Sequence, residues 1–275
     1  MTFQCEPAPG HGQLRRSIVR LVQSVALAFL LALVWAGPDF LDADSPPRSG
    51  AGLVQALAPL LGQPFRFDGA QDDKGRWVTF SRPDQVSPRP GFNCSGFAVA
   101  AARVLLDRPF SLGEASRDRR GDSGPGSPLG QDWDFGLDLI ANLTEGRALR
   151  VFPEETDLEA PAREPLGPGR SMGWGVNLHS RDFEDILAQI KPGCFAFFSL
   201  SRPDGRFPAG VAYHHVGLIV PEPPHLWLYH SLTGRGTHRI NLADPGQLAR
   251  FRSHYPPLVR GERRIFMIEA APPGL

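Results

Sequence analysis

The chain has 275 residues, of which 41% are hydrophobic, and it carries 29 basic and 29 acidic side chains. This length and apolar content suit one globular domain or one domain with a large insertion. The balanced charge gives no net attraction to nucleic acid or to an anionic membrane surface, and neither Lys74 nor Lys191 follows a glycine-rich phosphate-binding loop. The composition therefore argues against nucleic-acid-binding proteins and nucleotide enzymes.

The N-terminus has the pattern of an export signal. Three arginines precede an apolar run over residues 21–37, which is shorter than a comfortable membrane span. Val34 and Ala36 place small residues at positions −3 and −1 of a signal-peptidase site. We therefore expect a signal peptide over residues 1–36, with cleavage after Ala36 and a periplasmic or secreted product. An uncleaved membrane anchor is the alternative.

The mature chain is expected to begin with a linker over residues 37–50, which is rich in Pro, Gly and Ser. Two cysteines remain after cleavage, Cys94 and Cys194, too few for a disulfide framework. A bridge between them is open at this point, because the sequence cannot test its geometry.

Three helices are predicted before residue 150. Helical spacing of apolar residues runs through residues 51–62 and stops at Gly62. A second helix is predicted from about Cys94 to Leu106, with Asn93 or a neighbour as its cap. Residues 108–175 are rich in Pro, Gly and Arg, and they contain one predicted helix at 134–146. We interpret this segment as a long, partly irregular insertion.

The remainder of the chain predicts a helix followed by a sheet. Residues 180–190 form an amphipathic helical pattern with Ser180 as its expected cap. Short β-prone runs follow, separated by Pro, Gly and polar residues, at 191–200, 213–221, 225–232 and 237–242. This order predicts an α+β fold with an antiparallel sheet instead of a parallel βαβ array.

Cys94 is the first candidate for chemistry. It opens a predicted helix, where unpaired backbone N–H groups and the positive end of the dipole favour a thiolate and can stabilise an oxyanion. We therefore expect a thiol with a lowered pKa. The competing interpretation is a core cysteine, since a free cysteine packs as a small hydrophobe; this is the interpretation we give Cys194.

A thiol nucleophile needs a base, and five of the eight histidines lie between residues 214 and 238. Alternation along the predicted strand puts His214 and His215 on opposite faces, so only one can face the helix that bears Cys94. Alternation by itself does not decide which of the two it is. His230 ends the next predicted strand, where it can orient the base as the third member of a triad.

Four blocks of this sequence resemble the NlpC-type family of papain-like cell-wall cysteine peptidases, in the family's order. "LGQPFRFDG" (61–69) resembles its Pro-Tyr-Arg-Trp-Gly-Gly motif, and "PGFNCSGF" (90–97) its Asp-Cys-Ser-Gly nucleophile motif. "IKPGCFAFFS" (190–199) resembles its Lys-Pro-Gly-Asp strand. "HHVGLIV" (214–220) and the hairpin that follows resemble its His-Val-Gly strand and later histidine.

The resemblance implies a papain-like domain over residues 51–275, with the nucleophile helix packed on an antiparallel sheet and an insertion at about 108–175. It implies Cys94 as nucleophile, His215 as general base and His230 as orienting residue, so that His215 is expected to face the helix and His214 to face away from it. It also implies hydrolysis of amide bonds in peptidoglycan stem peptides by a protein, expected to be monomeric, that needs no metal or organic cofactor.

The sequence departs from the family at positions expected to touch the substrate. Phe65 replaces a tyrosine, and Asn93 replaces the aspartate before the nucleophile. With Ser95, which is small enough to let a substrate approach, these residues are expected to border the substrate. The departures loosen the link to peptides, so two alternatives remain: a papain-like acyltransferase that modifies lipids, and a wall-binding module without turnover.

Overall fold

The computed structural model describes residues 49–119, 133–154, 174–203, 211–258 and 262–275. The predicted signal peptide, its cleavage site after Ala36 and nearly all of the linker lie outside these residues. Within the described part, no helix is both long enough and apolar enough to cross a membrane.

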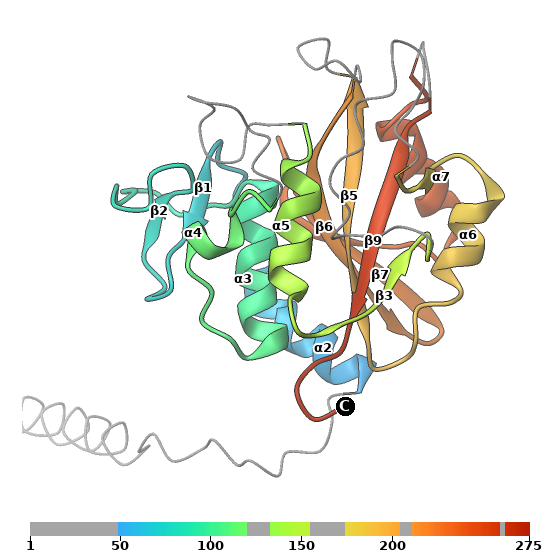
Figure 1. Cartoon of the computed structure of the whole chain (residues 1–275), viewed down its shortest axis with the longest axis horizontal. Helices are drawn as coiled ribbons and strands as arrows, with labels where there is room; N and C mark the ends of the chain where they lie inside the picture. Colours follow the sequence, from blue (N-terminus) through green and yellow to red (C-terminus); the bar gives the residue numbers. More distant parts are fainter. Residues whose placement is uncertain (1–48, 120–132, 155–173, 204–210, 259–261) are drawn as a thin grey trace, which may run out of the picture. The chain divides into compact units, whose positions relative to one another are not determined.

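The main sheet of the fold is antiparallel and has seven strands among the described residues (Figure 1). Six of them follow the order β3-β9-β5-β6-β7-β8, and β4 also pairs with β9. Its strands are β3 (Ala148–Phe152), β4 (Val176–Asn177), β5 (Phe195–Pro203), β6 (Val211–Glu222), β7 (His225–Leu232), β8 (Gly236–Asn241) and β9 (Arg264–Ala270). A separate pair, β1 (Gly69–Gln71) and β2 (Trp77–Thr79), lies beside the helices. The predicted α+β class is confirmed.

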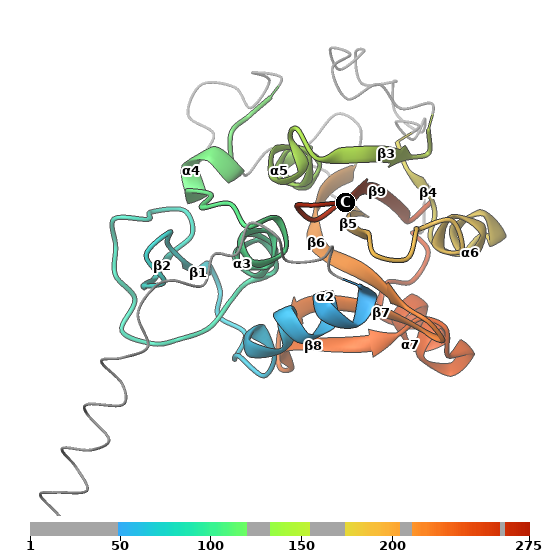
Figure 2. The same cartoon turned by 90° about the horizontal axis from the view of Figure 1, so that it is seen from below.

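Helices cover the sheet on both faces (Figure 2). One face carries α2 (Gly50–Leu57) with the short 3₁₀ turn η1 (Ala58–Leu60), α3 (Cys94–Leu106), α4 (Leu112–Ala115) and α5 (Phe135–Thr144). The other face carries α6 (Arg181–Leu187) and α7 (Pro245–His254). We refer to these as the α3 face and the α7 face.

Strand alternation divides the buried side chains of the sheet between two cores. On β6, Val216 and Leu218 belong to the core of the α3 face, whereas Ile219 belongs to the core of the α7 face. On β7, Tyr229 lies on the α3 face and Leu228 on the α7 face. Both faces are apolar because each must bury its side of the sheet against helices.

Helix α3 forms as predicted. Asn93 has extended backbone angles, and its side-chain Oδ1 accepts a hydrogen bond of 2.6 Å from Gly96 N–H. This satisfies one of the N–H groups that a helix start leaves without a partner. The helix is apolar on nearly all sides and is buried accordingly between the sheet, α2 and α5.

The segment predicted as a long insertion contributes to the core. Helix α5 lies within the predicted range 134–146, and all its residues are buried. Strand β3, which periodicity did not reveal, pairs with β9 at the edge of the main sheet. Arg150 on β3 is joined to the fully buried Glu269 on β9 by a 2.7 Å ion pair. Residues 120–132 and 155–173 of this segment lie outside the described part.

Two elements near the C-terminus were not predicted. Helix α7 begins after Asp244, whose side chain accepts from the N–H groups of Gly246 and Gln247, and Pro245 stands in its first turn. Strand β9 sits in the middle of the sheet between β3 and β5. An Asp-Pro pair is a helix-start signal that could have revealed α7.

Candidate active site

Cys94 reaches the sheet at an opening between β6 and β7. The ladder between these strands begins at the pair Leu218↔Tyr229, so residues 214–216 of β6 lie beyond its described pairs. The N-terminus of α3 meets β6 here: Cys94 Sγ donates to the carbonyl oxygen of His214 at 3.5 Å, and Val216 N–H donates to the same sulfur. The thiol therefore binds the backbone edge of β6 instead of packing across a face of the sheet.

The residues around Cys94 hold the helix start in this opening. Ser231 Oγ, at the end of β7, donates a 2.8 Å hydrogen bond to the carbonyl of Phe92. At Gly96 an added Cβ would lie 2.3 Å from the carbonyl oxygen of Gly69, so only glycine lets the helix approach β1 this closely. These contacts give a physical reason for the Cys-Ser-Gly sequence: the glycine sets the position of the thiol.

Three histidines form a hydrogen-bonded row across β6, β7 and β8. His215 Nε2 lies 3.2 Å from His230 Nδ1, and His230 Nε2 lies 3.1 Å from His238 Nε2. At the end of the row, His238 Nδ1 lies 3.0 Å from the carbonyl oxygen of Gly236. Cross-strand register accounts for the second contact, because His230 and His238 are direct partners in the β7–β8 ladder.

One assignment of protons satisfies the whole row when all three rings are neutral. The Gly236 carbonyl can only accept, so His238 carries its proton on Nδ1 and accepts at Nε2. His230 must then donate from Nε2 and accept at Nδ1, and His215 must donate from Nε2. His215 Nδ1 is left with a lone pair, which is what a general base requires.

Burial shifts the pKa values of the Cys94 thiol and the His215 imidazole in opposite directions. Burial raises the pKa of the Cys94 thiol, and the hydrogen bonds from Val216, Ser95 and Cys94 itself only partly oppose this. Burial also lowers the pKa of His215 to about 3, with a smaller contribution from neighbouring histidines. Both shifts favour neutral groups, so the expected thiol of lowered pKa is wrong for this resting structure.

The expectation that His215 lies on the face packed against α3 is also wrong. Its ring contacts Phe198 and Tyr255, with ring centroids 6.2 and 5.2 Å away, and both belong to the α7 face. Val216 takes the place under α3, because the buried core there favours an apolar side chain. The structure brings His215 and His230 together; among the described residues, no hydrogen bond joins either ring to the Cys94 thiol.

The predicted substrate-contacting residues lie around the start of α3. Phe65 is partly buried and bridges to Phe92, the residue before the helix cap. Asn93 uses its Oδ1 to cap the helix, and Ser95 is buried with its Oγ 3.9 Å from Cys94 Sγ. All three are close to Cys94 in sequence or structure, and the Ser95 hydroxyl lies against the thiol.

Cys194 lies far from Cys94 in the sheet. Leu200 pairs with His215 near the thiol, and Cys194 is buried at the opposite end of β5. Six residues of strand separate these positions, which is about 20 Å at roughly 3.4 Å per residue, against a Cα separation below about 7 Å in a disulfide. Both cysteines are free, and the Cys94–Cys194 bridge left open by the sequence does not form.

His238 is the member of the site that the sequence did not single out. The sequence indicated only that it is one of the five histidines between residues 214 and 238. Its role depends on the register of β7 with β8, which makes it the direct partner of His230. Among the described residues, no group of histidine, cysteine and carboxylate side chains is arranged to hold a metal ion.

Comparison with known proteins gives one structural neighbour to report. No family model matches the sequence, and no curated protein matches it. The crystal structure of protein LPG0564 from Legionella pneumophila, of the family model DUF1460, is similar over 82% of this chain and 92% of that chain. The two share 13% sequence identity, with a TM-score of 0.45.

Proposed function

We propose that this protein is a cysteine peptidase that hydrolyses amide bonds in peptidoglycan stem peptides, with Cys94, His215 and His230 as its triad. The observation that carries the proposal is the 3.2 Å hydrogen bond from His215 Nε2 to His230 Nδ1, on the strand whose backbone holds Cys94. It leaves His215 Nδ1 as the nitrogen that can receive the thiol proton.

The nucleophile is activated during the reaction in this proposal. Because burial favours the neutral thiol and the neutral imidazole, the proton moves from Cys94 Sγ to His215 Nδ1 as sulfur attacks the carbonyl carbon. The thiol must first turn away from the His214 carbonyl that it binds at rest. Catalytic hydrogen bonds are often long or misaligned before substrate arrives, which is consistent with this geometry.

The start of α3 supplies stabilisation for negative charge. Gly96 N–H donates to Asn93 Oδ1, while the backbone N–H groups of Cys94 and Ser95 donate to the sulfur. These two groups and the helix dipole favour the developing thiolate. The imidazolium then gives its proton to the leaving amine, and a water deprotonated by His215 releases the acyl group from sulfur.

Support for a peptide substrate comes from the resemblance of four sequence blocks to the NlpC-type family. The predicted export signal supports a substrate outside the inner membrane. His230, whose ring is held between His215 and His238, fits the orienting role that the resemblance implies. His238 and the Gly236 carbonyl extend that role, because they determine which nitrogen of each ring carries the proton.

Mass spectrometry of digested peptidoglycan tests the proposal. Isolated peptidoglycan is incubated with the wild type, with Cys94→Ala and with Cys194→Ala. We expect new peptide ends with the wild type and with Cys194→Ala, and none with Cys94→Ala, because Cys194 is the chain's other described thiol and lies at the far end of β5.

Two results would contradict the proposal. Cleavage by Cys94→Ala at the wild-type rate would show that this thiol is not the nucleophile. If untreated wild type leaves the peptidoglycan as intact as wild type with an alkylated Cys94 does, the protein does not hydrolyse it. Acyl transfer and wall binding would then be the remaining alternatives.

A further inference from the structure

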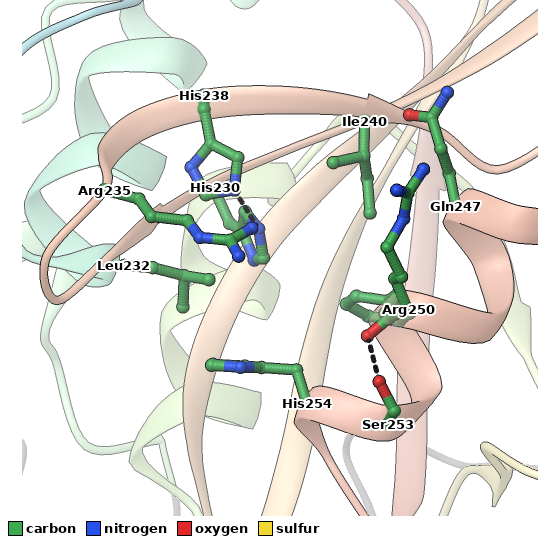
Figure 3. Close-up of a pocket in the computed structure, with 10 residues that line it drawn as sticks. His230, Leu232, Arg235, His238, Ile240, Gln247, Arg250, Ser253 and His254 are labelled. Carbon is green, nitrogen blue, oxygen red and sulfur yellow. Dashed lines mark hydrogen bonds between the residues drawn. The ribbon is translucent and has the colours of Figure 1, made fainter.

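A pocket of about 420 Å³ adjoins the outer end of the histidine row. It lies between the β7–β8 hairpin and α7, as Figure 3 shows. The hairpin contributes His230, Arg235 and His238 to its lining, and α7 contributes Arg250, Ser253 and His254. Pocket and triad therefore share His230.

The lining is cationic and contains no carboxylate. Two arginines and three histidines face the pocket, and neither aspartate nor glutamate is among its described lining residues. The guanidinium groups of Arg235 and Arg250 form no ion pair with any other described residue, in contrast to Arg150 and Arg252, which are paired with Glu269 and Glu184. In Figure 3 the Arg235 side chain extends toward the imidazoles of His230 and His238.

The positive charge of this pocket acts on the histidine row. Burial lowers the pKa of His238, and the charges of Arg235 and His254 lower it further, while the Gly236 carbonyl opposes them. Arg235 also contributes to the lowered pKa of His230, after burial and the neighbouring histidines. Asp244, which lies outside the lining, interacts electrostatically with Arg250, whereas no carboxylate is among the described residues that line the pocket itself. A concave, partly desolvated pocket with an excess of positive charge favours an anionic ligand.

We infer that this pocket binds an oxyanion, and that Arg235 and Arg250 are the residues that recognise it. Guanidinium groups match the planar geometry of a carboxylate or the oxygens of a phosphate, and the ring of His254 adds a hydrogen-bonding nitrogen to the lining. The Ser253 hydroxyl donates to the Arg250 carbonyl oxygen at 2.9 Å and therefore binds the helix backbone instead of the ligand. Our proposed occupant is a carboxylate of the substrate peptide. Only this choice of source rests on the proposed function; the anion site itself does not.

Nuclear magnetic resonance titration of His238 provides a direct test. The full chain with Cys94→Ala is used so that no probe is turned over. The probes are a short acidic stem-peptide fragment with a free carboxylate, the same fragment as its carboxamide, and inorganic phosphate. The titratable and charged groups that act on His238 are His230 from β7, Arg235 from the turn and His254 from α7, and Arg250 from α7 lines the same pocket.

We expect the carboxylate peptide to raise the pKa of His238, because a bound negative charge favours the imidazolium. The carboxamide should bind at least about ten-fold more weakly, as should the carboxylate peptide to Arg235→Gln or Arg250→Gln. Arg239→Gln is the matched control, since Arg239 lies on the same hairpin but stacks on Trp227 at 4.1 Å, outside the lining. Arg239→Gln should bind the carboxylate peptide as tightly as the Cys94→Ala protein that carries no second substitution.

The outcomes separate this inference from the proposed function. Binding of phosphate but not of the peptide would keep the anion site and identify its source as a free anion. Equal affinity for carboxylate and carboxamide, unchanged affinity in both arginine variants, or no shift of His238 with any probe would overturn the inference. None of these results depends on whether the wild type cleaves peptidoglycan.

Discussion

The two faces of β6 and β7 bury different kinds of side chain. On the α3 face, Val216, Leu218 and Tyr229 are fully buried in an apolar core under the nucleophile helix. On the α7 face, the same strands carry His215 and His230, which bond to each other. One strand thus stabilises the fold with one set of alternate residues and supplies the proposed chemistry with the other, because successive side chains point in opposite directions.

The largest expected effect comes from removing the proposed base, His215, on the α7 face. His215→Ala should lower kcat/KM for peptide hydrolysis by roughly 10²–10⁴, the usual contribution of a general base. His225→Ala is the control, because His225 is exposed at the start of β7 and lies outside the row. Steady-state kinetics on a stem peptide measure both. If the two variants are equally active, His215 is not the base.

The complementary change on the α3 face should affect stability instead. Leu218→Ala removes a fully buried side chain, so the free energy of unfolding should fall by about 2–5 kcal/mol. The folded fraction should keep a kcat near that of the wild type, since Leu218 points away from the histidines. Urea unfolding and kinetics on the same samples check this. A large loss of kcat without a loss of stability would show that the two faces are not separate in function.

Acid should lower the free energy of unfolding through the buried histidines of the α7 face. The folded pKa of His215 is about 3, below the ordinary value of 6.5, so between these pH values the unfolded chain binds a proton that the folded chain does not. The contribution of His215 to the free energy of unfolding is therefore fully present above about pH 6.5. It decreases as the pH falls, by up to about 1.4 kcal/mol per pH unit. The pKa of His230 is lowered in the same direction by burial and by His215, and adds to the effect.

Urea unfolding at several values between pH 7 and about pH 5 measures the contribution of the histidines, including His238, whose pKa is also lowered by burial, because carboxylates titrate below that range. The double variant His215→Gln, His230→Gln should show a much smaller dependence on pH. A wild type whose stability is constant across the range would mean that the folded protein does not lower the pKa of these rings.

The smallest expected effect concerns the residue that caps the nucleophile helix. Asn93 Oδ1 accepts the hydrogen bond from Gly96 N–H. Asn93→Asp therefore keeps the cap and places a second carboxylate oxygen where the amide nitrogen now lies. From the family resemblance, this charge should favour peptides with a free amino terminus by about ten-fold, the value of one charge-assisted hydrogen bond.

The measurement is kcat/KM on a matched pair of free and N-acetylated stem peptides. The wild type should discriminate weakly between them. A wild type that already prefers the free amine strongly would show that another group in the chain supplies the missing negative charge. The control Ser49→Ala weakens the corresponding cap of α2, which packs beside α3 but carries none of the predicted site residues, and should leave this ratio unchanged.

Local patterns in the sequence were enough to predict the α+β class, helix α3 with its Asn93 cap, helix α5 and the strands that carry the histidines. Each of these depends on residues close together in the chain: a cap beside its helix, apolar spacing along one turn, and alternation along one strand. The candidates Cys94, His215 and His230 followed from the same patterns together with the resemblance.

Only the tertiary structure decided how these residues meet. The end of the β6–β7 ladder lets α3 bring Cys94 to the backbone of His214, and the register of β7 with β8 places His238 beside His230. The place of β3 beside β9, and the burial that keeps both thiol and imidazole neutral, likewise arise from contacts between distant parts of the chain. Such contacts leave no periodic signal, because strand pairing and desolvation depend on what packs around a residue and not on its neighbours in sequence.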